Sequence, residues 1–401
     1  MKPSAVTVVV PTFNRGGFLV ECLASILAQT RPADEIIVVV DGSTDNTLEL
    51  LTPYEDRVRV LSKENEGKAA ALNFGMVHAS HGLIWIFDDD DLAEPDALET
   101  LVGLLELDPR ADFAYGRHDR FSIDSSGAMQ RLGTGYWQHC EPDEFLATTL
   151  DDMFAHQQGM LVRKDLYRRA GPFDETLIRS QDYDMQIRLA RLGRVIGTDK
   201  VVFLQRVHDE ARGNASERFG ATERQSKWGQ FDKVIFRKLY FDLELNKYLG
   251  TEPVPTGFLG SRHALLRRAS VMARKQVWDF ALKDLRLAAR VSGAPLSKAE
   301  IYTLRAVFGS KYGCDEILEK PEIAQHLCKL AADPWMGAQI VSSLARGLRW
   351  KVRAELVKIR CWKSLSYFLI MYKLNRASTM SITAKSAHLT HGHEIHDSRY
   401  L

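Results

Sequence analysis

The first part of the chain repeats a short apolar run followed by a helical pattern of apolar positions. The apolar runs, several of them rich in valine and isoleucine, are residues 6–11, 35–42, 57–63 and 82–91. After each run, apolar residues recur every three or four positions, in segments 18–30, 44–54, 67–80 and 95–108. Four strand–helix units in succession predict a mostly parallel sheet with right-handed crossovers and helices on its faces.

The pattern changes further along the chain. Residues 111–210 mix extended pieces with a helical segment at 182–193, and long helical patterns dominate from about residue 222. We therefore expect an α/β domain over residues 1–221 and an α-helical C-terminal region over 222–401. The last part, 380–401, is predicted to be a flexible tail, as chain ends often are.

Composition and charge exclude several classes of protein. The 401 residues carry a formal net charge of +1, which predicts no general attraction to nucleic acid. Five scattered cysteines without CxxC spacing make a disulfide framework or a zinc site unexpected. The N-terminal apolar run is too short for a signal peptide, and no apolar stretch is long enough for a membrane span. The expected location is therefore the cytoplasm.

Three predicted strands end in residues that suit a ligand site. These ends are Pro11-Thr12, Asp41-Gly42 and the run Asp88–Asp91. In sheets of this type, ligands bind at the carboxyl ends of the strands. A run of acids taken alone is more often a solvated loop or a helix cap. Its position beside two other strand ends favours a site for a hard divalent cation, which binds carboxylate oxygens together with substrate phosphates.

Five motifs, in order over about residues 5–210, resemble the family-2 inverting glycosyltransferases with the GT-A fold. The matching segments are VVVPTFNRGGFLVECLASILAQT, EIIVVVDGSTDNT, ENEGKAAALNFGMVHASHGLIWIFDDDD, GPFDETLIRSQDYDMQIRLARLG and RVH. A single motif such as DGSTD is weak, whereas five in register are specific. The resemblance implies a GT-A catalytic domain, a nucleotide-binding sheet flanked by helices, over residues 1–221.

The resemblance also implies which residues bind the nucleotide-sugar donor. Pro11 and Phe13 match positions that line the nucleobase, and Asn14 beside them belongs to the same nucleotide-binding set. Asp41 matches an acid that accepts a hydrogen bond from a uracil ring. Lys68 falls where a basic or polar residue approaches the base or a phosphate. A UDP-sugar is therefore the expected donor.

The acidic run and two later residues supply the expected metal and catalytic groups. By resemblance, Asp90 binds the metal, Mn²⁺ or Mg²⁺, while Asp88 and Asp89 approach the ribose and a metal-bound water. His208 matches a histidine that reaches the metal or the diphosphate. Asp182 matches the general base, which removes the proton from the acceptor hydroxyl. The implied reaction is hexosyl transfer, with inversion, to a hydroxyl of a glycan or glycolipid, as in surface polysaccharide synthesis.

One departure from the family pattern keeps other functions open. The family usually has Glu before the base aspartate, whereas this chain has Gln181. A degenerate member that serves as a binding or scaffold protein is therefore an alternative. A sugar nucleotidyltransferase is a further alternative, although that class needs a glycine-rich basic loop, and PTFNRGG offers only Arg15.

The segment 335–376 is strongly basic. It carries nine Lys or Arg residues against a single acid, Glu355, with aromatic residues interleaved. One interpretation is a membrane-surface helix that presents the enzyme to a lipid-linked acceptor. The other is a basic helix packed on the rest of the protein. Homo-oligomerisation is also left open.

Overall fold

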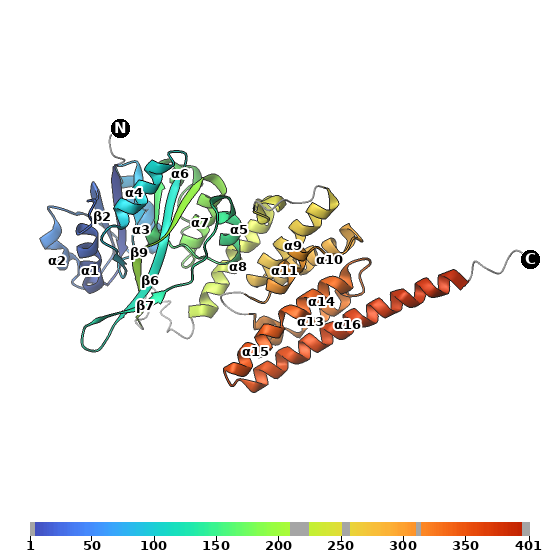
Figure 1. Ribbon diagram of the computed structural model, residues 1–401. Helices are drawn as coiled ribbons and strands as arrows, with labels where there is room; N and C mark the ends of the chain where they lie inside the picture. The colour runs from blue at the N-terminus through green and yellow to red at the C-terminus, as the bar shows by residue number, and fades with distance from the viewer. Residues whose placement is uncertain (1–4, 209–223, 251–256, 310–313, 395–401) are drawn as a thin grey trace, which may run out of the picture. The chain divides into compact units, whose positions relative to one another are not determined.

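The computed structural model describes residues 5–208, 224–250, 257–309 and 314–394, the side chains of 224–227 and 384–394 excepted (Figure 1). The chain divides into two compact units, Met1–Phe231 and Asp232–Leu401. This division falls within helix α8 (Arg224–Asp242), a little after the boundary predicted at residue 221.

The first unit is built on one sheet in the order β3-β2-β1-β4-β8-β6-β9-β5, with β7 paired to β6. Its parallel half contains β1 (Val6–Thr12), β2 (Glu35–Asp41), β3 (Arg59–Lys63) and β4 (Leu83–Ile86). The helices that follow these strands are α1 (Gly16–Leu27), α2 (Thr47–Leu51), α3 (Lys68–His78) and α4 (Ala97–Leu107). The predicted strand–helix succession is confirmed.

The second half of this sheet is mixed. Strand β8 (Met160–Arg163) runs antiparallel between β4 and β6 (Phe113–Ile123), and β9 (Val195–Arg206) runs parallel to β6. Two shorter strands are β5 (Leu92–Ala93) and β7 (Met129–Thr134). The helices here are α5 (Phe145–Asp151), α6 (Lys164–Ala170) and α7 (Gln181–Leu192). The antiparallel pairing brings distant segments next to the end of β4.

Two apolar cores cover the two faces of the sheet. Val8 and Val10 of β1 face the core formed with α1 and α4, and Val9 faces the core on the side of α3 and α7. Side chains alternate along a strand, so a strand buried on both faces is apolar at every position. Gly75 of α3 lies against Val9, whose Cγ1 would be 2.7 Å from an added Cβ. The glycine lets this helix pack closely on the sheet.

The predicted fourth strand is shorter than expected. It ends at Ile86, and residues 88–91 form a turn in which the Asp91 N–H donates to the Asp88 carbonyl at 3.3 Å. The four aspartates therefore lie beyond the strand end and not along an extended chain.

The second unit is helical throughout its described residues. After α8 its helices are α9 (Phe258–Arg274), α10 (Trp278–Val291), α11 (Lys298–Ala306), α12 (Glu316–Glu319), α13 (Pro321–Leu330), α14 (Gly337–Gly347), α15 (Arg349–Val357) and α16 (Cys361–Glu394). Arg262 of α9 and Glu300 of α11 form a buried ion pair at 2.7 Å. The predicted α-helical C-terminal region is confirmed.

Helix α16 continues to Glu394 through much of the segment in which a tail is predicted, and the flexibility of 380–401 stays a prediction. None of the helices in the described ranges is both long enough and apolar enough to cross a membrane. The cytoplasmic location stays a prediction.

Candidate active site

The turn after β4 holds its four aspartates with separate partners. Asp88 lies nearest to the end of the strand. Its Oδ1 is 2.6 Å from the Nζ of Lys68, the first residue of α3, and accepts a hydrogen bond from Gln157 Nε2 at 2.7 Å. Lys68 and Asp88, 20 positions apart in the chain, meet because β4 lies beside β1 and α3 packs on the same sheet.

Asp89 and Asp90 share one cation. The Arg15 guanidinium lies 3.2 Å from Asp89 Oδ1 and 3.0 Å from Asp90 Oδ2. Burial raises the pKa of Asp89 to about 6, a rise that Arg15 opposes and the charge of Asp90 reinforces. Burial lowers the pKa of Arg15, but Asp89 and Asp90 outweigh it, so the net shift is upward. Arg15 therefore stays charged between the two carboxylates.

The end of β9 approaches the same turn. His208 Nε2 lies 3.1 Å from Asp90 Oδ2, which brings the two predicted metal ligands together. The Nε of the buried Arg206 donates to the Asp90 carbonyl at 2.8 Å, and its guanidinium pairs with Glu21 at 2.7 Å. The charge of Arg206 is therefore matched by Glu21, while its backbone and Nε hold the turn in place.

Asp91 has a different environment from its neighbours. Its Oδ2 accepts a hydrogen bond from Gln158 Nε2, and its Oδ1 accepts one from the Arg206 N–H, both at 2.8 Å. The side chain is buried. Asp91 thus ties β9 to the segment that precedes β8.

The donor set of this turn fits a hard cation. Asp88, Asp90 and Asp91 each offer a carboxylate oxygen, and these oxygens lie within 4.8 Å of one another. Oxygen ligands in such a group are those that Mg²⁺ and other hard divalent ions take. Asp90, the predicted metal ligand, belongs to this group, and Asp89 does not.

Asp41, at the end of β2, organises the loop before α3. Its carboxylate accepts hydrogen bonds from the N–H groups of Glu66 at 3.1 Å and Gly67 at 2.8 Å, and Lys63 Nζ lies 3.2 Å away. Burial lowers the pKa of Lys63, but Glu66 and Asp41 outweigh it and raise the pKa overall. Asp41 therefore fixes the loop that leads directly into Lys68.

The residues after β1 join the ends of two strands. Pro11 is buried and Phe13 half-buried. Asn14 has a positive φ of 52°, and its Oδ1 accepts a hydrogen bond from the Thr44 N–H at 2.7 Å, while its own N–H donates to Ser43 Oγ at 3.0 Å. Asparagine tolerates this left-handed conformation better than most residues. The Asn14 side chain thus connects the turns that carry Arg15 and Asp41.

Asp182 lies in the first turn of α7, and its Oδ1 accepts a hydrogen bond from the Tyr183 N–H at 2.9 Å. Burial lowers the pKa of Lys68, but the charges of Asp88 and Asp182 outweigh it and raise the pKa overall. Lys68 therefore links the predicted base electrostatically to the acidic turn. The preceding residue, Gln181, is buried, and its Oε1 has no hydrogen-bond partner among the described residues.

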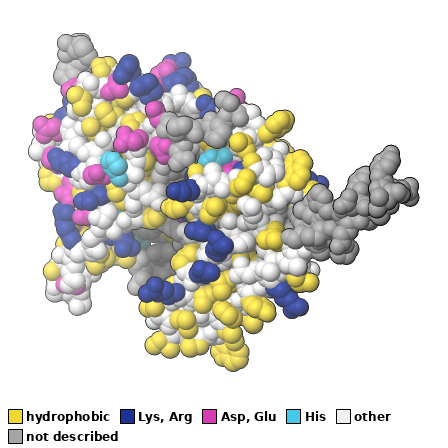
Figure 2. Space-filling view, turned by 45° about the vertical axis from the view of Figure 1, so that its right-hand side comes forward, with side chains coloured by type: hydrophobic (Ala, Val, Ile, Leu, Met, Phe, Trp, Pro, Cys, Tyr) yellow, Lys and Arg dark blue, Asp and Glu magenta, His cyan; other side chains and the backbone are white. Residues whose placement is uncertain are grey.

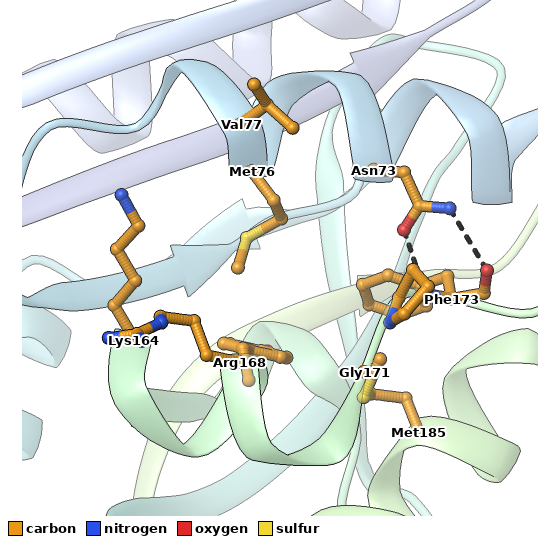
Figure 3. A pocket seen from close by; sticks show the side chains of 10 residues that line it. Asn73, Met76, Val77, Lys164, Arg168, Gly171, Phe173 and Met185 are labelled. Atoms are coloured by element: carbon orange, nitrogen blue, oxygen red, sulfur yellow. Dashed lines mark hydrogen bonds between the residues drawn. The ribbon is translucent and has the colours of Figure 1, made fainter.

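The segment before α7 is held by α3. Asn73 Oδ1 accepts a hydrogen bond from the Phe173 N–H at 2.8 Å, and Asn73 Nδ2 donates to the Phe173 carbonyl at 3.0 Å (Figure 3). Next to this contact is a cavity of about 420 Å³, lined by residues that include Met76, Lys164 and Arg168. No predicted site residue lines this cavity, so it is separate from the acidic turn.

Sequence reasoning missed several residues of the site. Arg15 could have been recognised, because it follows the end of β1 on the edge where the other site residues lie. Gln157 and Gln158 carry no such signal, since they reach the turn through the antiparallel pairing of β8 with β4.

Part of the chain is similar to a known family of proteins. Residues 7–171 match the family described as "Glycosyl transferase family 2". An "Uncharacterized glycosyltransferase" of Rickettsia bellii is 26% identical over 255 residues, which are 61% of this chain and 36% of that protein. "Glycosyltransferase GlyG" of Streptococcus pneumoniae is 40% identical over 134 residues, 32% of this chain and 44% of the relative. The chain thus spans less than half the length of these two relatives.

A solved structure has the same fold. The crystal structure of S. aureus TarS 1-349 in complex with UDP-GlcNAc matches with a TM-score of 0.50 and 16% sequence identity. The match covers 93% of this chain and 92% of that chain. The predicted GT-A type of fold is confirmed.

Proposed function

We propose that this protein is a glycosyltransferase that moves a hexose from a nucleotide sugar to an acceptor hydroxyl, since residues 7–171 match glycosyl transferase family 2. The proposed reaction depends on a divalent cation and inverts the configuration of the sugar. The proposed acceptor is a glycan or a glycolipid. UDP-sugars are the donor class to test first, since the TarS structure holds UDP-GlcNAc and Asp41 resembles a uracil-binding acid.

The charge of the acidic turn is the observation that carries the proposal. Four carboxylates lie in consecutive positions, and two cationic side chains, Lys68 and Arg15, pair with them. Carboxylate oxygens of Asp88, Asp90 and Asp91 nevertheless lie within 4.8 Å of one another, a group of ligands that suits a hard divalent ion. Asp90 and His208 would hold the ion, with Asp88 or Asp91 able to complete the set. When bound, the cation would neutralise the charge that develops on the departing diphosphate.

Residues of the chain would bind the nucleobase and accept the proton of the acceptor. Asp41 has three donors near its carboxylate, and a carboxylate has about four lone-pair sites, which leaves capacity for a nucleobase N–H. Asp182 would accept the proton of the attacking hydroxyl as general base. Lys68 lies 2.6 Å from Asp88, and the charges of Asp88 and Asp182 both act to raise its pKa, so its positive charge acts on the turn and on the proposed base together.

A donor screen followed by a transfer assay tests this proposal. The thermal stability of the full chain would be measured with UDP-, GDP- and dTDP-sugars, each with Mn²⁺, Mg²⁺ or EDTA. A donor that binds the folded state raises Tm by mass action, and EDTA should abolish the rise. A Tm rise that persists undiminished in EDTA would contradict the cation dependence.

The role of the base is tested by a matched pair of variants. Asp182→Asn should keep the donor-induced Tm rise and lose transfer by about 10²–10⁴-fold, the usual contribution of a general base. Asp184→Asn is the control, because Asp184 lies in the same helical turn but pairs with Arg188 at 2.7 Å. Transfer at the wild-type rate by Asp182→Asn would remove Asp182 from the mechanism.

The buried Gln181 favours one second candidate, a binding protein without transferase activity. A neutral amide stands where the family usually has a carboxylate, and its Oε1 has no hydrogen-bond partner in the part of the chain that the structure describes. This candidate predicts cation-dependent donor binding in the wild type with no transfer to any acceptor, and no effect of Gln181→Glu on binding.

A further inference from the structure

The turn between α15 and α16 exposes large apolar side chains. We name residues 356–363 the α15–α16 tip. Within it, Val357 is 78% exposed, Ile359 85% and Trp362 83%. Figure 2 shows hydrophobic side chains gathered at the bottom of the view, where Figure 1 places α15 within the second unit. Single exposed apolar residues are ordinary, but a contiguous group marks a binding surface.

Helix α16 continues this surface along its outer face. Its inner face is fixed in the unit by Ser364, Tyr367 and Leu374, which are buried. The Tyr367 hydroxyl donates to Asp315, and Ser364 Oγ donates to the Val352 carbonyl at 2.9 Å. The outer positions of a surface helix are normally polar. Here they are exposed and apolar at Leu365, Leu369 and Tyr372.

The exposed charged side chains within residues 349–376 have one sign. Exposed Lys and Arg side chains between positions 349 and 376 are Arg349, Arg353, Lys358, Arg360, Lys373 and Arg376. The only acid in that range is Glu355, which is buried and lies 3.7 Å from Arg360. Apolar side chains at the tip thus lie among cations, and the acid beside them, Asp315, is paired with Lys363.

We propose that the α15–α16 tip and the outer face of α16 form a docking surface for an anionic lipid bilayer. Apolar side chains would enter the interface, and the surrounding cations would contact the lipid headgroups. A second copy of the chain suits this surface less, because a two-fold contact would place cations against cations. Of the basic segment 335–376, only the part after α14 belongs to this docking surface, because most of α14 is buried in the unit. It does not rest on the proposed transferase function.

Vesicle flotation of the full chain, without donor or metal, tests the proposal. Vesicles of phosphatidylcholine alone would be compared with vesicles that contain phosphatidylglycerol. We expect binding to the anionic vesicles only, weakened by salt. Lys358→Gln with Arg360→Gln should weaken it by up to about 30-fold, at about fivefold for each cation. Ile359→Ser with Trp362→Ser should abolish the binding.

Controls keep the test independent of folding. Leu107→Ser changes an equally exposed apolar residue, 78% exposed at the end of α4, and should bind as the wild type does. Circular dichroism and Tm should be unchanged in every variant, because the substituted side chains are exposed. Equal binding to both kinds of vesicle, or full binding by the Ile359 and Trp362 variant, would overturn the proposal. The proposal would also be overturned if the wild type formed a dimer without lipid and the Ile359 and Trp362 variant were a monomer, because the surface would then bind a second copy of the chain.

Discussion

Substitution of Asp91 should destabilise the protein much more than substitution of its neighbour Asp90. Asp91 is buried and accepts hydrogen bonds from Gln158 Nε2 and the Arg206 N–H, each at 2.8 Å. Asp91→Ala leaves both donors buried without an acceptor. A buried unsatisfied group costs about 1–3 kcal/mol, so the loss should be about 2–6 kcal/mol. Asp90→Ala also removes contacts, with Arg15 and His208, but it relieves the repulsion between Asp89 and Asp90.

The assay is thermal unfolding in EDTA and then in Mn²⁺. For a unit of this size, about 1 kcal/mol corresponds to about 2–4 °C in Tm. A loss of about 4 kcal/mol therefore predicts that Asp91→Ala lowers Tm in EDTA by about 8–16 °C. Asp90→Ala should stay within about 4 °C of the wild type, because it removes repulsion as well as contacts. The Mn²⁺-induced rise in Tm should be lost in Asp90→Ala.

Two results would refute this reasoning. Equal destabilisation by the two substitutions would show that Asp90 supports the fold as much as Asp91 does. A stable Asp91→Ala variant without a Mn²⁺ response would make Asp91 the metal ligand, which its distance from Asp88 and Asp90 allows. Asp91→Asn, which keeps one acceptor oxygen, should fall between the wild type and Asp91→Ala in Tm.

Three further predictions concern buried charges. Arg15→Gln leaves Asp89 and Asp90 without their shared guanidinium, so Tm in EDTA should fall and the Mn²⁺-induced rise should grow; an unchanged Tm would contradict this. Burial raises the pKa of Glu316 to about 7 from its ordinary 4.5, so its contribution to stability is complete below pH 4.5 and is lost as pH rises through 7. At about 1.4 kcal/mol per pKa unit, the free energy of unfolding of the wild type should fall by about 3 kcal/mol between pH 4.5 and pH 8. Glu316→Gln should remove this fall, as measured by urea unfolding at the two pH values. Arg262→Met strands the buried Glu300 carboxylate and should cost about 3–5 kcal/mol in the same assay, with part recovered by adding Glu300→Gln.

The strand ends of the first unit could be predicted because local pattern determines them. Strands β1, β2 and β4 are apolar at nearly every position, as strands buried on both faces must be. The predicted site residues lie at or just after the end of each strand. Parallel pairing then brings Pro11, Asp41 and Asp88 to one edge of the sheet. The edge of the sheet at which the site lies can therefore be predicted from hydrophobic periodicity and the rules for strand connections alone.

The partners of each site residue could not be predicted in the same way. Gln157 reaches Asp88 from 69 positions away, and Arg206 reaches Asp91 from 115 positions away. These contacts depend on the antiparallel insertion of β8 and on the irregular register between β6 and β9. Neither feature leaves a periodic signal in the sequence. The turn at residues 88–91 was also missed, because four like charges indicate no particular backbone conformation.

The distribution of partners explains how four consecutive carboxylates are tolerated in a largely buried turn. Two unit charges 4 Å apart interact by about 4 kcal/mol at the effective dielectric constant of a protein surface. Lys68 offsets this repulsion at Asp88, Arg15 offsets it between Asp89 and Asp90, and Asp91 is held by neutral donors. Arg206 adds little positive charge to the turn, because its guanidinium is paired with Glu21. Among the described residues, Lys68 and Arg15 thus hold the turn together while oxygens of Asp88, Asp90 and Asp91 stay within 4.8 Å of one another, and that grouping is what favours a divalent cation at this edge of the sheet.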